Sequence, residues 1–427
     1  MAIAQFINRR RRAGVLAAAA LAVLAAAVDV VGAAQPADAA AGRPPVGLSL
    51  PAPTGRYQVG SIALHLVDHS RADPWQPDVP YRELMVSLYY PTRHAADHAP
   101  TPYMLPAAAA HFDAVDINQY LGLDLPTGQT NWAATATHVA QRAPVAGRGL
   151  PVLLYSPGLG EPRTWDTTLV TDLASRGYLV VTIDNTYESP EVQFPLSATD
   201  PDGPLRTLTL PDISQPDQLT AFLAKTLAVR AADTSFVLDS LAALDTGHNP
   251  DAEHTALPAG LTGAFNLRAV GMFGHSVGGS AAAVAMDADP RITAGLDFDG
   301  NLSYPDGSLT APAAHGLRRP FLLVGKDGDT DTGPGWQAFL ANTPGWAKEL
   351  TLRGSEHASF TDAEALLPQL GLSPDALSAD IGTIDPRVAL TTERAYVAAF
   401  FDRWLRGRNN HLLDGPSPAY PAMEFVG

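Results

Sequence analysis

Short apolar runs alternate with segments of helical spacing over the last two thirds of the chain. The apolar runs mostly end at Gly, Pro, Asp or Asn, which is typical of strands buried on both faces. They cover residues 150–158, 178–185, 267–274, 292–299, 320–327 and 348–354. Helical periodicity covers residues 163–178, 217–244, 391–407 and the segment that begins at about 277. This alternation predicts an α/β fold with a mostly parallel central sheet flanked by helices on both faces.

The first part of the chain has a different pattern. Two β-like segments, 57–68 and 82–92, predict an antiparallel strand pair before the parallel sheet. Residues 101–148 mix Pro, Ala and aromatic residues without a clear period, and residues 188–216 form a long proline-rich insertion. A loop of that length in a compact domain is often a functional cover. The insertion at 188–216 is therefore a candidate lid, with an inert surface excursion as the alternative.

The N-terminus has the pattern of an export signal. Arg9–Arg12 precede an apolar run from Ala13 to Val28, and the small-residue site Ala37-Asp38-Ala39 follows. These features predict a cleaved secretory signal at 1–39, exported by the Sec or the twin-arginine route, with an uncleaved membrane anchor as the alternative. Residues 40–55 then read as a Pro- and Gly-rich leader, and residues 56–427 as a single catalytic domain. No later stretch is apolar and long enough to predict a membrane span.

Charge and cysteine content narrow the function classes. The chain has 28 basic and 44 acidic residues; removal of four Arg and two Asp with residues 1–39 leaves 24 against 42, a net charge of −18. Such a charge disfavours nucleic acid and anionic membrane surfaces as partners. The chain contains no cysteine, which excludes thiol catalysis and thiolate metal sites. The oligomeric state is left open.

The segment GMFGHSVGGS, residues 271–280, contains a candidate nucleophile. G-x-S-x-G alone is a weak motif, because the 36 glycines of the chain make a chance match a real risk. Here, however, Ser276 follows a predicted strand and precedes a predicted helix, as a nucleophile elbow requires. The turn is tight, so Gly274 and Gly278 are expected to lack side chains for steric reasons. The amide of Val277, at the helix start, is expected to face the oxyanion.

A serine nucleophile needs a base, an orienting acid and a second oxyanion donor. In a sheet of this kind the acid and then the histidine follow the serine. His357, in RGSEHASF directly after the last of these predicted strands, is the candidate base, whereas His315 and His411 are placed less suitably. The second oxyanion donor is assigned to the Leu159 amide, in the Gly-rich loop SPGLGEPR.

The acid is not decided by position alone. Asp299 ends the strand at 292–299, and Asp327 follows the next strand. Both are frequent places for this residue, and both have an alternative role as caps of the following turn.

Several segments together resemble the plasma-type (group VII) platelet-activating-factor acetylhydrolases and their bacterial relatives, within the α/β-hydrolase fold. From about residue 53 to 360 they are, in order, PTGRYQVG, LYYPT, LLYSPGLG, LASRGYLVVTIDN, VRAADTSFVLDSL, GHSVGG, GLDFDG and GSEHASF. The resemblance implies a Ser–Asp–His triad that hydrolyses short or oxidised acyl esters without calcium. Ser276 and His357 fall on the nucleophile and base of the family, Asp299 on its acid, and Leu159 and Val277 on its oxyanion pair.

The chain also departs from this family. Pro157 replaces the family's usual histidine, and residues 101–148 and 188–216 find no match. Because these insertions are expected to shape the acyl pocket, substrate choice is the property least safely inherited.

The sequence thus predicts a secreted serine esterase or lipase that acts on small-molecule or lipid esters. No metal or cofactor is needed for this chemistry; the H-x-x-x-H pairs His65/His69 and His94/His98 lack a third ligand and are read as structural. A cutinase-like polyester depolymerase, a peptidase and a catalytically inactive binding protein are the alternatives.

Overall fold

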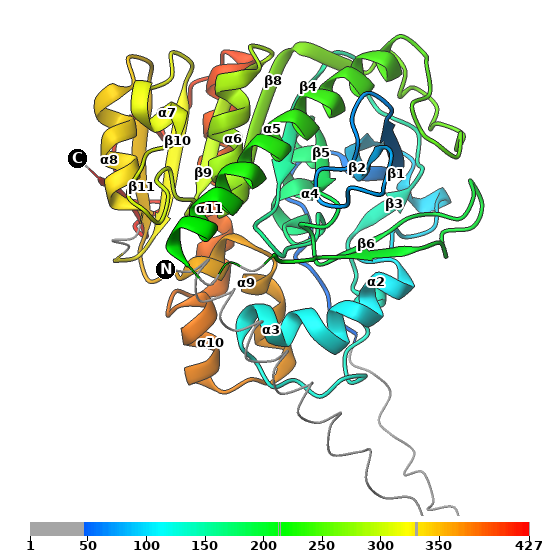
Figure 1. Ribbon diagram of the computed structural model, residues 1–427, viewed down its shortest axis with the longest axis horizontal. Coiled ribbons are helices and arrows are strands. Elements are labelled where there is room, and N and C mark those ends of the chain that lie inside the picture. Colours follow the sequence, from blue (N-terminus) through cyan, green and yellow to red (C-terminus); the bar gives the residue numbers. More distant parts are fainter. Residues whose placement is uncertain (1–46, 212, 214, 329–331, 427) are drawn as a thin grey trace, which may run out of the picture.

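A ten-stranded sheet runs through the whole molecule (Figure 1). The structure is a computed structural model that describes residues 47–211, 213, 215–328 and 332–426. The strand order is β12-β11-β10-β9-β8-β4-β5-β2-β1-β3. The eight strands predicted from the sequence are β1 (Gln58–Asp68), β2 (Arg82–Thr92), β4 (Leu150–Ser156), β5 (Leu179–Asp184), β8 (Phe265–His275), β9 (Ile292–Phe298), β10 (Phe321–Lys326) and β11 (Ala347–Leu352).

The pairing of the strands explains their composition. The six strands from β11 to β5 pair in parallel, and β4 and β5 have no exposed residue, in keeping with their unbroken apolar runs. β1 and β2 form the expected antiparallel pair, and β2 joins them to β5, also antiparallel. The predicted α/β-hydrolase fold with a mostly parallel sheet is confirmed.

Helices cover both faces of the sheet. α5 (Pro216–Asp245), α6 (Val277–Ala288), α7 (Ala311–His315) and α8 (Gly333–Asn342) bury their apolar side chains in one core cluster with the strands. α4 (Thr167–Ser175) and α11 (Pro386–Arg406) do so on the other face. In Figure 1, α5 and α6 accordingly lie in front of the strands and α11 behind them. Each long helix packs one of its sides against the sheet, and that side is apolar. The resulting helical spacing of apolar residues made these segments predictable from the sequence.

Four strands, the helices α7 and α8 and several short elements were not predicted; two of these strands lie in the insertion at 188–216 described below. β3 (Val139–Gln141) and β12 (Met423–Val426) extend the two edges of the sheet and are too short for a recognisable alternation. The remaining short elements are η1 (Ala95–Asp97), α2 (Pro106–His111), η2 (Phe112–Asp116, a π-helical turn), α3 (Ile117–Leu121), η3 (Trp132–Ala134), η4 (His357–Phe360), α9 (Ala363–Leu366), η5 (Leu367–Leu370) and α10 (Pro374–Ile381).

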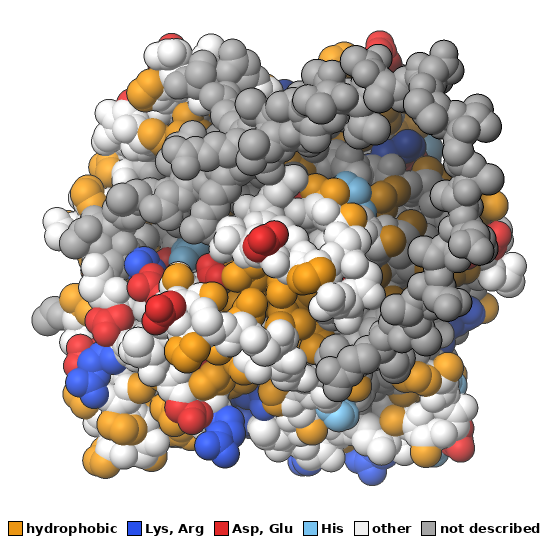
Figure 2. Space-filling model, turned by 90° about the horizontal axis from the view of Figure 1, so that it is seen from below, with side chains coloured by type: hydrophobic (Ala, Val, Ile, Leu, Met, Phe, Trp, Pro, Cys, Tyr) orange, Lys and Arg blue, Asp and Glu red, His pale blue; other side chains and the backbone are white. Residues whose placement is uncertain are grey.

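The insertion at 101–148 forms a layer under the sheet. Its aromatic residues Phe112 and Trp132 share an apolar cluster with Trp165, Ala358 and Ile381, so the insertion packs against the segment that begins at His357. Figure 2 shows this lower face, with hydrophobic side chains gathered near its centre and acidic and basic side chains toward its lower left. The partly buried apolar side chains that pack against the cluster include Leu123, Leu125, Leu370, Leu372 and Leu377.

The insertion at 188–216 contains a small hairpin, β6 (Glu191–Gln193) with β7 (Leu205–Thr207). Val192 and Phe194 are buried against Met85 of β2, so the start of the insertion is anchored on the antiparallel pair. That the insertion acts as a lid stays a prediction.

The predicted export signal at 1–39 lies outside the described residues, as do residues 40–46 of the leader. Among the helices that the structure describes, none combines the length and the hydropathy needed for a membrane span.

Candidate active site

Ser276 lies in a strained turn between β8 and α6. Its backbone has φ +55° and ψ −125°, a conformation that L-residues rarely adopt. The Ser276 amide donates to the Phe298 carbonyl at 2.7 Å, which fixes the turn against the end of β9. The sequence expectation of a strand–turn–helix at this serine therefore agrees with the structure.

Glycines are required around this serine for lack of space. A Cβ on Gly278 would lie 1.9 Å from the Ser156 carbonyl oxygen, and one on Gly274 would lie 2.4 Å from the backbone of Gly278. Gly279, which the sequence reasoning did not single out, is equally constrained, because a Cβ there would lie 1.7 Å from Asp297 Oδ1. Each of these contacts is far below van der Waals distance, so the elbow closes only with glycine.

Asp299 and His357 are in direct contact. Asp299 Oδ2 and His357 Nδ1 are 2.5 Å apart, and Asp299 Oδ1 accepts a hydrogen bond from the Lys326 amide at 3.2 Å. Asp299 is buried, which raises the pKa of its carboxyl, but the hydrogen bond and the charge of His357 outweigh burial and lower the pKa overall. An ionised acid therefore faces the imidazole nitrogen that points away from substrate in a triad. The Asp299 backbone, at φ +54°, turns sharply after β9 to reach this position.

Asp327, the other candidate acid, has a different partner. Its Oδ2 accepts from the Gly354 amide at 2.8 Å. It thus braces the loop that carries His357 without contacting the imidazole. The structure brings Asp299, and not Asp327, to His357.

The position of His357 relative to the elbow is fixed through the residue before Ser276. His275 Nε2 donates to the main-chain carbonyl of His357 at 2.9 Å, and the two imidazole rings lie 4.4 Å apart between centroids. The His357 side chain is 22 % exposed, so its ring is reachable from outside the buried core. His315 and His411, by contrast, contact Asp287 and Asp414 near the surface.

The loop after β4, residues 157–160, is termed the oxyanion loop below. Leu159 in this loop and Val277 at the start of α6 belong to one apolar cluster. Among the described residues, neither amide donates a hydrogen bond within the protein, so both donors are available to a ligand. The other buried members of the cluster, from α5, α6 and the second insertion, are Ile213, Phe222, Leu223, Leu227 and Ala281. An apolar wall thus lies beside the two predicted oxyanion donors.

Glu161 and His275 are the residues of this region that the sequence reasoning missed. Both are buried, and His275 Nδ1 lies 2.7 Å from Glu161 Oε1. Because the base is expected last in chain order, histidines before Ser276 were not candidates. The signal was available in the motif itself, because His275 directly precedes Ser276.

One group of side chains in the described part of the chain has the residue types of a metal site. His111, Asp116 and Glu191 have ligand atoms within 4.8 Å of one another. His111 Nδ1 lies 2.6 Å from Asp116 Oδ2, however, whereas ligands that share a metal ion at about 2.0–2.2 Å are about 3 Å or more apart. The imidazole of His111 therefore contacts the two carboxyl groups directly. His65 and His69 contact Glu253 and Tyr81, so they do not converge as two ligands.

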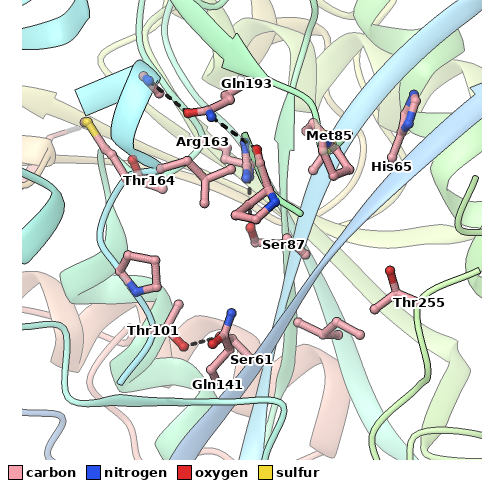
Figure 3. Close-up of a pocket in the computed structure, with 18 of the residues that line it drawn as sticks. Ser61, His65, Met85, Ser87, Thr101, Gln141, Arg163, Thr164, Gln193 and Thr255 are labelled. Atoms are coloured by element: carbon pink, nitrogen blue, oxygen red, sulfur yellow. Dashed lines mark hydrogen bonds between the residues drawn. The ribbon is translucent and has the colours of Figure 1, made fainter. Parts of the chain in front are cut away.

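A cavity of about 550 Å³ lies on the side of the antiparallel strand pair (Figure 3). Both insertions and the β1–β2 surface line it, and Arg163 inside it donates to Ser87 Oγ at 2.8 Å. None of Ser276, Asp299 and His357 lines this cavity. It is therefore separate from the acyl site that those residues would serve.

The known proteins that this chain resembles are named for ester hydrolysis. The family model described as platelet-activating factor acetylhydrolase, isoform II, matches residues 46–413. A relative from Arthroderma benhamiae named "Probable 1-alkyl-2-acetylglycerophosphocholine esterase" is 30 % identical over 415 residues, which cover 91 % of this chain and 97 % of the relative. A solved structure, a ferulic acid esterase from Streptomyces cinnamoneus, is 35 % identical with a TM-score of 0.70, and the match covers 90 % of this chain and 100 % of the esterase.

Proposed function

We infer the function from the family: the chain belongs to the platelet-activating factor acetylhydrolase family, so it is a serine carboxylic-ester hydrolase. Within this activity we assign the nucleophile to Ser276, the base to His357 and the orienting acid to Asp299. The observation that carries the assignment is the hydrogen bond between Asp299 Oδ2 and His357 Nδ1 beside the strained Ser276 turn.

The proposed mechanism follows from these contacts. His357 Nε2 takes the proton from Ser276 Oγ as the oxygen attacks the ester carbonyl carbon, and the Leu159 and Val277 amides donate to the resulting oxyanion. The tetrahedral intermediate collapses, the C–O bond to the alcohol breaks, and His357 returns the proton to the leaving oxygen. Water, deprotonated by His357, then attacks the acyl-enzyme; the bond between the acyl carbon and Ser276 Oγ breaks, His357 returns the proton to Ser276 Oγ, and the acid is released. Asp299 holds Nδ1 protonated throughout, so that Nε2 is free to accept.

The proposed substrates are carboxylic esters with short or oxidised acyl chains, including those of lipids. The relative from Arthroderma benhamiae is named for an acetyl ester of an alkyl glycerophosphocholine, which supports this class. The cluster around Leu159 and Val277 is apolar, so it would bind the uncharged part of an acyl chain next to the ester carbonyl.

Esters of hydroxycinnamic acids are a second candidate class. The ferulic acid esterase shares 35 % sequence identity with this chain, whereas the relative from Arthroderma benhamiae shares 30 %. Aromatic side chains also border the same cluster, namely Trp75, Tyr120 and Tyr304. These rings would pack against a phenylpropenoyl group as well as against an alkyl chain.

The deciding experiment is a specificity profile with one enzyme preparation. It compares kcat/KM for p-nitrophenyl esters of two to sixteen carbons, a 1-alkyl-2-acetylglycerophosphocholine, an oxidised phospholipid and methyl ferulate, with a polyester film as an insoluble substrate. We expect the highest values for two to four carbons and for the acetylated or oxidised lipid. Preference for methyl ferulate by more than tenfold would select the second class, and release of acid from the film alone would select a depolymerase.

Secretion is part of the proposal and rests on the sequence of residues 1–39. Expression of the full chain in a host with both export routes, followed by mass determination of the exported protein, tests it. The expected mature chain begins close to residue 40. Retention of the full-length chain in the membrane fraction would favour the uncleaved anchor.

A further inference from the structure

Glu161 and His275 connect the two halves of the proposed active site. Glu161 Oε2 accepts from the Gly158 amide at 2.5 Å, in the oxyanion loop. Glu161 Oε1 contacts His275 Nδ1 at 2.7 Å, and His275 Nε2 reaches the carbonyl of His357 at 2.9 Å. One continuous chain of hydrogen bonds therefore runs from the oxyanion loop to the residue that acts as base.

The hydrogen-bond partners of His275 and Glu161 favour the charged form of both side chains. A carbonyl oxygen only accepts, so His275 Nε2 carries a proton; the Glu161 carboxylate on the other side calls for a proton on Nδ1 as well. Glu161 in turn receives three donors, from Gly158, His275 and the Tyr120 hydroxyl. This arrangement favours an imidazolium at His275 paired with a carboxylate at Glu161 in the interior.

The directions of the pKa shifts agree with a charged pair. Burial lowers the pKa of His275, but Glu161 outweighs burial and raises the pKa overall. Burial raises the pKa of Glu161, and the charge and hydrogen bond of His275 reverse the direction. The pair remains ionised because each member compensates the other, whereas either one alone would be a costly buried charge.

The oxyanion loop is held from two sides. Arg230, itself paired with Glu188, donates to the carbonyl oxygens of Pro157 and Gly158. Glu161 binds the Gly158 amide, and a Cβ on Gly158 would lie 2.7 Å from the Glu161 carboxyl group. Glycine at 158 thus makes room for this carboxylate. With its flanking groups fixed, the Leu159 amide is left as the donor that the loop offers.

We propose that Glu161 and His275 are positioning residues that hold the oxyanion loop and the loop of His357 in one fixed relation. This inference rests on the proposed function, since it assigns the two residues a role in the step that Ser276, His357 and the Leu159 amide carry out. A shift of either loop by even about 1 Å would misplace a donor or the base, with a rate cost of about 10²-fold.

The test uses Glu161→Gln in the full-length protein. The amide has one acceptor oxygen for three donors and turns an N–H group toward another donor, so the chain of hydrogen bonds breaks. Burst kinetics with p-nitrophenyl acetate give the acylation rate constant and the dissociation constant of the substrate separately. We expect acylation to slow by about 10- to 100-fold, with substrate binding changed less than about threefold.

A transition-state analogue and two further variants sharpen the test. A trifluoromethyl ketone, which forms an oxyanion on the serine, should lose affinity by the same factor as acylation. Glu161→Asp, which keeps the charge, should recover part of the rate. Glu253→Gln is the matched control, because Glu253 also pairs with a histidine, His65, at 2.9 Å. This variant should leave the acylation rate constant and the affinities for substrate and analogue within about twofold of wild type.

Two results would overturn the proposal. One is a folded Glu161→Gln protein that acylates within twofold of wild type; the other is a loss of analogue and substrate affinity by the same factor. If Glu161→Gln does not fold, His275→Gln carries the same test with the same limits. Failure of the proposed function looks different, because the wild type itself would then show neither turnover nor labelling of Ser276 by a fluorophosphonate.

Discussion

Replacement of Asp299 by Asn should reverse the tautomer of His357, the proposed base. Asp299 Oδ1 accepts from the Lys326 amide, whereas Oδ2 faces His357 Nδ1. In Asp299→Asn the carbonyl oxygen must stay at Lys326, because the side-chain NH₂ cannot accept from an amide. The NH₂ group then points at His357 Nδ1 and can only donate to it. Nδ1 loses its proton, Nε2 gains one, and Ser276 faces a nitrogen that cannot act as base.

The expected magnitude is that of a triad with the wrong tautomer, a fall in kcat of about 10⁴-fold. This corresponds to about 5 kcal/mol at 1.36 kcal/mol per factor of ten. The side chain keeps its shape and its hydrogen bond to Lys326, so the thermal midpoint should shift by only a few degrees. The assay is hydrolysis of p-nitrophenyl acetate under saturating conditions, with thermal unfolding measured on the same samples.

Asp327→Asn is the control for this experiment. Asp327 accepts from the Gly354 amide, and an asparagine carbonyl oxygen can do the same, so kcat should stay within about threefold of wild type. If Asp327→Asn lost several orders of magnitude in kcat while Asp299→Asn kept it, the assignment of the acid and the tautomer argument would both be wrong.

Three further changes test the elbow and the buried acids. Ser276→Ala should abolish ester turnover and leave the thermal midpoint within a few degrees; residual activity above about 10⁻³ of wild type would contradict the role of Ser276. Gly278→Ala places a Cβ 1.9 Å from the Ser156 carbonyl oxygen and should reduce activity or folding, whereas Gly415→Ala, with open space around it, should not; equal results for the two in activity and circular dichroism would refute the steric argument. Burial raises the pKa of Glu364 to about 8, so the folded protein binds more protons than the unfolded chain between about pH 4.5 and 8, and this group lowers the free energy of unfolding as the pH rises through that window. Urea unfolding should show Glu364→Gln gaining stability over wild type from pH 5 to pH 9, and an equal difference at both pH values would contradict this.

The main elements of the fold follow from the sequence because burial on both faces leaves a strong pattern. The strands β4 and β5 are nearly continuous apolar runs, and the buried residues of α5 and α11 recur with a helical period. The edge strands β3 and β12, of three and four residues, have no such pattern. Their strand conformation depends on pairing with distant segments, which no local property of the sequence encodes.

The sequence predicted which residues of the candidate site lie at the ends of strands, but not the direction of their side chains. Asp299 and Asp327 follow neighbouring parallel strands, so both lie at the same edge of the sheet, and position alone could not separate them. The difference lies in side-chain direction: a turn at φ +54° brings Asp299 to His357, whereas Asp327 is directed to the Gly354 amide. Resemblance to the family, and not periodicity, gave the preference for Asp299.

The buried pair of Glu161 and His275 could not be derived from spacing. The two residues are 114 positions apart, and their contact depends on how the loop after β4 returns beside β8. A histidine directly before the nucleophile was the one local sign, and by itself it has no required partner.

Active-site labelling tests the central claim, that Ser276 forms the acyl-enzyme, most directly. The native protein is treated with a fluorophosphonate, and intact mass, peptide mapping and remaining esterase activity are followed over time. The account predicts one adduct per chain, located on Ser276, with activity lost in proportion to labelling. Complete loss of activity with Ser276 unmodified, or full labelling of Ser276 with activity retained, would contradict it.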